Sequence, residues 1–148
     1  MPQSLAQIYV HLVFSTKGRV PLIPAEDAPR LHAYLAGAGQ AIECPALLVG
    51  GVTDHVHILF RLSKNRALSD AVKELKVESS KWMKEQGVRE FGWQAGYGAF
   101  SIGAAQAEAV TEYIRNQEQH HRRRTFQEEF RELLRRYQVE FDEAYVWD

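Results

Sequence analysis

The sequence predicts an α+β fold of ferredoxin-like type, in which a β-α-β-β-α-β order forms an antiparallel sheet with helices on one face, followed by C-terminal helices. Three observations lead to this prediction. Four segments have the residue pattern of strands, two segments with helical spacing separate them, and the connection between the middle two strands is short enough for a hairpin. At 148 residues the chain can bury a real core, and we assign residues 1–148 to a single domain.

The composition is that of an ordinary globular protein. Hydrophobic residues make up 45% of the chain and charged residues 25%. A single cysteine, Cys44, excludes an internal disulfide framework and fits a reducing compartment. No apolar run approaches the roughly 20 residues that cross a bilayer, and the first residues do not have the pattern of a secretion signal. We therefore expect a soluble, cytoplasmic protein.

The first half of the chain contains three predicted strands and one helix. Residues 7–14 alternate apolar and other side chains, as a strand does. Prolines keep the following residues irregular until a helix begins, whose spacing is marked by Leu31, Tyr34, Leu35 and Ala38. Residues 46–52 then form an apolar strand, and the next strand begins at His55. The connection at residues 53–54 predicts an antiparallel hairpin.

The second half contains one more strand and three predicted helices. The first helix has Ser69 as a candidate N-cap, ends at Gly87, and carries an apolar stripe made of Leu68, Val72, Leu75, Ser79, Trp82 and Met83. The last strand is predicted over residues 93–102, where glycines permit the close approach of another backbone. A long helix should start near Ala104 and run past Gln117. A final helix should start at Thr125, with Glu128 as its capping-box partner.

Two histidines on the third strand form a candidate metal site. Side chains alternate faces along a strand, so His55 and His57 point to one side while Val56, Ile58 and Phe60 form an apolar stripe on the other. If the helices cover the apolar stripe, His55 and His57 lie on an open face of the sheet. His11 on the first strand is a further candidate for this face. Two imidazoles on one face can hold an ion, but the same pattern also occurs in ordinary, half-exposed strand histidines.

The long helix contributes two further candidates. Tyr113 and Gln117 lie four residues apart and therefore on one helix face, with His120 one turn further. A tyrosine hydroxyl can act as a covalent nucleophile. An amide oxygen is a hard donor that suits Mg²⁺ or Mn²⁺ alongside imidazole. The alternative is that Tyr113 is a partly buried helix tyrosine and Gln117 a surface amide.

Positive charge is concentrated in two segments although the whole chain has a net charge of −1. Residues 61–90 carry eight cations against five anions, and residues 115–124 carry four cations against one anion. A local basic face is sufficient to bind phosphates. The candidate DNA contacts are Lys76, Arg115, Arg122 and Arg123. The alternative is that these residues belong to ordinary solvated helix faces.

Several short motifs occur in this order and spacing: residues 9–17 (YVHLVFSTK), 54–57 (DHVH), 74–76 (ELK) with Ser79 and Ser80, Trp93 with 96–97 (GY), and 113–117 (YIRNQ) with His120 and His121. Through them the chain resembles the one-tyrosine HUH transposases of the bacterial insertion-sequence 200/605 group over nearly its whole length. That family is similar in fold to the ferredoxin-like arrangement predicted above.

The resemblance implies a function and a set of site residues. His55, His57 and Gln117 match the ligands of a divalent metal, Mg²⁺ or Mn²⁺, and Tyr113 matches the nucleophile. The implied reaction is cleavage and rejoining of single-stranded DNA with hairpin ends through a 5′-phosphotyrosine intermediate. The resemblance also implies a bacterial origin and a homodimer in which Tyr113 can serve the partner's histidines. His120 and His121 match the family pattern without an assigned role.

Three other interpretations stay open at this point. The first is a domesticated, repeat-associated tyrosine nuclease with the same chemistry and a host role. The second is a non-catalytic module that binds single-stranded nucleic acid on a ferredoxin-like sheet. The third is a structural protein with two incidental histidines. The sequence contains no glycine-rich nucleotide-binding loop, which agrees with strand transfer that needs no ATP.

Overall fold

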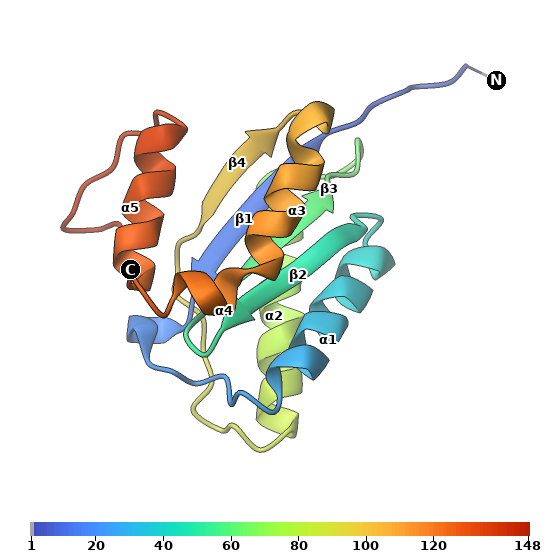
Figure 1. Ribbon diagram of the computed structural model, residues 1–148. Helices are drawn as coiled ribbons and strands as arrows, with labels where there is room; N and C mark the ends of the chain where they lie inside the picture. Colours follow the sequence, from blue (N-terminus) through green and yellow to red (C-terminus); the bar gives the residue numbers. More distant parts are fainter. Residues whose placement is uncertain (1) are drawn as a thin grey trace.

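The computed structural model describes residues 2–148. The protein consists of a four-stranded antiparallel sheet with helices on both of its faces (Figure 1). The strand order is β2-β3-β1-β4. The strands are β1 (Tyr9–Ser15), β2 (Ala46–Val52), β3 (His55–Arg61) and β4 (Gly98–Ile102). The α-helices are α1 (Ala28–Ala41), α2 (Leu68–Glu85), α3 (Ala107–Arg115), α4 (Gln117–His120) and α5 (Phe126–Arg136). The short 3₁₀ turn η1 (Lys17–Arg19) follows β1, and a second one, η2 (Ala104–Gln106), precedes α3.

This architecture confirms the predicted α+β, ferredoxin-like fold. Strand β1 lies at the centre and pairs with β3 on one side and β4 on the other. Strands β2 and β3 form the predicted hairpin, with Thr53 and Asp54 in the turn. Within residues 2–148, no helix has the combination of length and apolar character that a bilayer-spanning segment requires.

One face of the sheet carries the main core. The stripe predicted on β3 is buried, and it meets the alternating apolar side chains of β1. Helices α1 and α2 cover this face, with Leu31, Leu35 and Leu75 fully or almost fully buried. The apolar stripes predict the buried face of each element correctly here. Burying each aliphatic side chain stabilises the fold by about 1.5–3 kcal/mol, so the stripes of the strands and helices must face one another.

The opposite face is also covered, and the prediction of an open histidine face is wrong. Helices α3 and α4 cross this face in front of β3 and β2, and α5 lies beside them toward β4 (Figure 1). Helix α5 buries Phe126, Phe130, Leu133 and Leu134 against Val13 and Phe100. Helix α3 buries Ile114 against Leu59 and Ile102. Every strand therefore has apolar side chains on both faces, and the histidines lie inside the protein.

Two local details differ from the predictions, and a third agrees. Helix α2 begins at Leu68, so Ala67 and not Ser69 occupies the N-cap position, while Asp70 supplies a carboxylate to the first turn. Strand β4 is shorter than expected, although Trp93 forms an isolated bridge with Thr16. The capping box of Thr125 and Glu128 is present as predicted, because both of its hydrogen bonds are local.

The predicted long helix is interrupted at Asn116, which separates α3 from α4. Residues 107–120 contain neither glycine nor proline, so the local sequence does not predict this break. Gln117, the first residue of α4, has a fully buried side chain that contacts His55 and Glu129. The break therefore lies where the chain meets the histidine face.

Candidate active site

Three histidines of the central strands form the floor of the site. His11 on β1 and His55 and His57 on β3 are each at most 1% exposed. They share a sheet face because β1 and β3 are paired in register, with Val13 opposite His57 and Ser15 opposite His55. His55 and His57 therefore lie on the same face, as predicted, and they are covered by the C-terminal helices.

The carboxylate of Glu129 lies at the centre of this cluster. Glu129 belongs to α5 and is fully buried. Its Oε1 atom lies 3.1 Å from Nε2 of His57, 3.4 Å from Nε2 of His55 and 3.0 Å from Nε2 of His121. Three imidazole rings from two parts of the chain thus converge on one oxygen atom.

The second carboxylate oxygen of Glu129 contacts the two predicted residues of the C-terminal helices. Tyr113 donates its hydroxyl hydrogen to Oε2, and Nε2 of Gln117 donates to the same atom at 2.8 Å. The amide oxygen of Gln117 lies 3.0 Å from Nε2 of His55. The structure therefore brings Tyr113, Gln117, His55 and His57 together around Glu129.

Further side chains orient the imidazoles. Nδ1 of His55 lies 2.7 Å from a carboxylate oxygen of Asp54, and Nδ1 of His57 lies 2.8 Å from Nε2 of His11. Nδ1 of His121 lies 3.0 Å from the carbonyl oxygen of Arg124. In each ring one nitrogen is held by these partners and Nε2 faces the centre. A carboxylate behind an imidazole is the usual support of a metal-binding histidine.

Burial and the central carboxylate set the charges of the cluster. Burial lowers the pKa of His11 to about 3 and also lowers the pKa of His57, so both rings are neutral at pH 7. Burial alone would lower the pKa of His55 as well, but hydrogen bonds to Asp54 and Glu129 outweigh it and raise this pKa to about 9. The pKa of Glu129 is lowered despite its burial, because His57, His121 and His55 surround it.

Tyr113 is held as a neutral phenol in this arrangement. Burial raises its pKa above the ordinary value, and the adjacent Glu129 carboxylate raises it further. Nη2 of Arg124 donates to the phenol oxygen at 3.1 Å and acts in the opposite direction.

A glycine in β2 sets the distance of α3 from the sheet. A Cβ atom at Gly50 would lie 2.7 Å from Cγ2 and 2.8 Å from the carbonyl oxygen of Ile114. Real Cβ contacts are essentially never that short, so only glycine allows α3 to lie this close to β2. Because Ile114 follows Tyr113, this contact also positions the phenol over the histidines.

The donor atoms suit a divalent cation. His55, His121 and Glu129 offer ligand atoms that all lie within 4.8 Å of one another, and Gln117 adds an amide oxygen next to His55. Ligand bonds of about 2.1 Å at right angles would put neighbouring donor atoms about 3.0 Å apart, close to several spacings found here. Imidazole nitrogens with carboxylate and amide oxygens fit Mn²⁺ or Mg²⁺.

The four predicted DNA contacts lie in three different places. Arg122 and Arg123 are exposed and line a hollow of about 550 Å³ that also borders Asp54 and His121. Arg115 is exposed and forms an ion pair with Glu112. Lys76 lies on the other side of the sheet, where its ammonium group donates to the backbone carbonyl oxygens of residues 94–96.

Sequence reasoning missed Glu129 and gave no role to His121 and Asp54. One signal for Glu129 was available. It lies three residues after Phe126 and four before Leu133, so it occupies the apolar stripe of α5. A carboxylate in such a stripe must be paired when the helix packs.

Comparison with known proteins identifies the family of the chain. Residues 4–117 match the family model described as "Transposase IS200 like". The chain belongs to this transposase family. The matched range includes His55, His57, Tyr113 and Gln117 and ends before His121 and Glu129. No curated protein sequence matches the chain.

Two solved structures resemble the fold of this transposase. A provisionally assigned transposase from Deinococcus radiodurans R1 has a TM-score of 0.64 and 21% sequence identity, over 79% of this chain and 98% of that one. A REP-associated tyrosine transposase bound to a REP hairpin has a TM-score of 0.58 and 12% identity, over 82% of this chain and 73% of that one. At these identities both likenesses concern the fold.

Proposed function

We propose that this transposase cleaves and rejoins single-stranded DNA through a covalent bond to Tyr113. The observation that carries the proposal is the convergence of Tyr113, Gln117 and the paired histidines of β3 on one buried point. A nucleophile, a set of metal ligands and a hydrogen-bonded carboxylate next to the nucleophile are the parts that such a reaction requires.

The reaction exchanges one phosphate ester for another. The oxygen of Tyr113 forms a bond to the scissile phosphorus, and the bond from that phosphorus to the 3′ oxygen breaks. The 3′ oxygen leaves as a hydroxyl, and the DNA 5′ end remains as a phosphotyrosine ester. The proton of Tyr113 passes by way of Oε2 of Glu129, to which the phenol is already hydrogen-bonded, and solvent to the departing 3′ oxygen, so that no proton is gained or lost overall. Attack of a 3′ hydroxyl on the ester reverses these steps and rejoins a strand without ATP.

Divalent metal binding completes the proposed site. His55, His57 and Gln117 would hold Mg²⁺ or Mn²⁺, and Glu129 and His121 are placed to add two further ligands. A bound ion would polarise the scissile phosphate and neutralise developing negative charge. Arg124 is placed to stabilise the oxygen of Tyr113 as that residue loses its proton.

The proposed substrate is single-stranded DNA with a hairpin. The similar REP-associated structure is bound to a hairpin, which supports this choice. Arg122 and Arg123 border the hollow beside Asp54 and His121, so a phosphate that approaches the histidines passes these two cations. A repeat-associated nuclease would use the same site, and DNA flanking the gene distinguishes it from a mobile element.

A homodimer is a separate proposal that comes from the family resemblance, which allows Tyr113 to serve the histidines of its own chain or those of its partner. Within one chain, the ring of Tyr113 already lies 5.8 Å from the ring of His57, measured between centroids. Each chain thus has the residues of a full site. A dimer with exchanged helices would change which chain supplies the tyrosine, whereas a dimer without exchange would keep each site within one chain, and the chemistry is the same in both.

The covalent adduct tests the proposed function. Purified protein is incubated with a pool of single-stranded DNA hairpins and Mn²⁺, and adducts that survive denaturation are mapped by mass spectrometry. We expect wild type to carry DNA on Tyr113 and Tyr113→Phe to form no adduct. Tyr34→Phe is the control, since Tyr34 stacks on Trp82 away from the site. An adduct that forms normally in Tyr113→Phe would overturn the mechanism, and an adduct that persists in excess chelator would overturn the role of the metal.

A further inference from the structure

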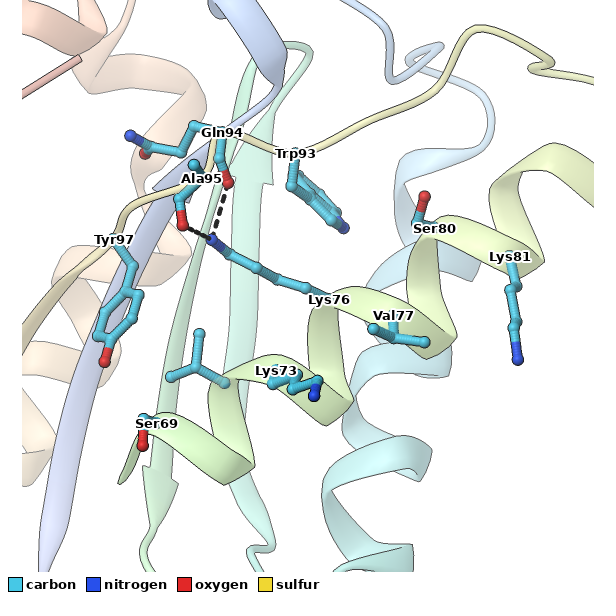
Figure 2. A pocket seen from close by; sticks show the side chains of 11 residues that line it. Ser69, Lys73, Lys76, Val77, Ser80, Lys81, Trp93, Gln94, Ala95 and Tyr97 are labelled. Carbon is cyan, nitrogen blue, oxygen red and sulfur yellow. Dashed lines mark hydrogen bonds between the residues drawn. The ribbon is translucent and has the colours of Figure 1, made fainter. Parts of the chain in front are cut away.

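A second hollow lies on the sheet face opposite Tyr113, between α2 and residues 93–97 (Figure 2). Its volume is about 590 Å³. Helix α2 and the loop before β4 form its two walls. The cleavage chemistry proposed above uses none of its residues.

The hollow is basic and partly aromatic. Three lysines line it, and no carboxylate is among the lining residues in the part of the chain that the structure describes. The lining residues that matter here are Lys73, Lys76, Val77, Lys81, Trp93 and Tyr97. Tyr97 and Val77 are among the large apolar side chains exposed to solvent, at 37% and 42%. A basic groove with an accessible aromatic ring is the combination with which proteins bind single-stranded nucleic acid.

Charge is separated across α2. Glu74 and Glu78 lie on the side of the helix that faces α1, where they line a different hollow with Tyr34. Lys73 and Lys81 are exposed on the other side, and neither takes part in any ion pair found among residues 2–148. These two lysines are eight residues apart, which is about 12 Å along the helix axis. They can therefore contact two separate phosphates of one strand.

Lys76 gives the hollow its fixed shape. Its ammonium group donates to the carbonyl oxygens of Gln94 at 2.8 Å and Ala95 at 3.2 Å (Figure 2). It also donates to the carbonyl oxygen of Gly96 at 2.7 Å, and the three bonds tie the loop to α2. The same ammonium group lies 5.5 Å from the centroid of the Tyr97 ring. On the other wall, Nε1 of Trp93 donates to Oγ of Ser79 at 2.9 Å. The aromatic rings are thus held in place before any ligand arrives.

We propose that this hollow binds a segment of unpaired DNA, with a base stacked on Tyr97 and phosphates contacted by Lys73 and Lys81. The proposal rests on the function proposed above and adds a second DNA contact on the far side of the sheet from the scissile phosphate. Lys76, which the sequence analysis had selected as a phosphate contact, positions the loop in this account. The hollow binds DNA without taking part in cleavage.

Binding of labelled DNA, measured by fluorescence anisotropy without divalent metal, tests the proposal. The probe is a 20-nucleotide single strand of thymidines. We expect Tyr97→Ala to weaken binding about tenfold, because one stacked base is lost, while Tyr97→Phe keeps the ring and binds like wild type. Lys73→Gln with Lys81→Gln should weaken binding and reduce the slope of log affinity against log salt by about 1.4, because two phosphate contacts are removed.

A matched pair of substitutions controls for charge. Lys64 and Lys84 are exposed and do not line the hollow, so Lys64→Gln with Lys84→Gln removes the same charge elsewhere. We expect this pair to bind like wild type. If both lysine pairs weaken binding equally, or if Tyr97→Ala binds like wild type while its folding is intact by circular dichroism, the hollow is not the binding site.

Two results separate this proposal from the proposed function. Normal adduct formation on Tyr113 together with unchanged DNA affinity of the hollow variants would overturn the further inference alone. Failure of Tyr113 to form an adduct, with single-strand binding still dependent on Tyr97 and the lysines, would overturn the proposed reaction alone. Photocrosslinking with a strand that contains 5-iododeoxyuridine adds a direct measurement, and we expect the crosslink on Tyr97 or Trp93.

Discussion

The Nε2 atom of His57 lies 3.1 Å from Oε1 of Glu129, and this contact joins the central sheet to the C-terminal helix α5. The family match ends at residue 117, so it includes His57 but not Glu129. Glu129 also contacts Tyr113 and Gln117 through its other oxygen. The C-terminal helix therefore belongs to the site, and the predictions below depend on this connection.

Glu129→Gln should weaken Mn²⁺ binding at least tenfold. The substitution keeps the shape of the side chain and removes the one buried negative charge at the centre of the cluster. Isothermal titration calorimetry of the apo protein measures the affinity directly. The thermal stabilisation by Mn²⁺ should fall in parallel, because a ligand that binds only the folded state stabilises it. Glu140→Gln removes the same charge from an exposed position and serves as the control. Equal affinities in all three proteins would exclude Glu129 as a ligand.

Gly50→Ala should displace α3 and impair adduct formation. The added Cβ would overlap Ile114, and overpacking of this kind costs about 1–3 kcal/mol of folding free energy. Denaturant unfolding measures the stability, and the adduct assay measures the position of Tyr113. Gly37→Ala on α1 is the matched control, because a Cβ there meets nothing within 4 Å. In a helix this control should be neutral or stabilising. A Gly50→Ala protein as stable and as active as wild type would show that α3 is not held by this contact.

Protonated His55 should make the apo protein lose stability as the pH rises. Its folded-state pKa of about 9 lies above the unfolded value of 6.5, so its contribution is complete below pH 6.5 and disappears as the pH passes through about 9. This difference corresponds to on the order of 3 kcal/mol. The measurement is the unfolding free energy of wild type minus that of His55→Asn, between pH 6.5 and 9.5 in the presence of chelator. Burial lowers the pKa of Lys76 to about 8, so Lys76 also contributes to the pH dependence of stability. Its contribution is the same in both proteins and cancels in the difference. A difference that does not change with pH would show that Asp54 and Glu129 do not hold His55 in its charged form.

Tyr113 should act on the histidines of its own chain. In one chain its hydroxyl already contacts Glu129, which in turn contacts His57. Mixing a Tyr113→Phe protein with a His57→Ala protein should therefore recover no cleavage. Recovery in the mixed sample would mean that one chain supplies the tyrosine and its partner the histidines. Light scattering of the same samples reports whether a dimer is present at all.

Much of the fold followed from local patterns. Alternation along β1 and β3 and helical spacing in α1, α2 and α5 predicted these elements, because burial of apolar side chains decides which face of each element turns inward. The capping box at Thr125 was predictable because its hydrogen bonds span only three residues. The break at Asn116 was not, since no residue in that segment is a helix breaker.

The sequence by itself determined the β-α-β-β-α-β order of the elements, the position of His55 and His57 on one strand face, and the candidacy of Tyr113 and Gln117 through their four-residue spacing. Only the tertiary structure decided that this face is buried and that Glu129, His121 and Asp54 join it. The physical reason is that a carboxylate can be buried only where partners from distant segments compensate its lost hydration. Those partners come from β3, from Tyr113 and Gln117, and from His121, and local sequence patterns do not record which of these segments meet.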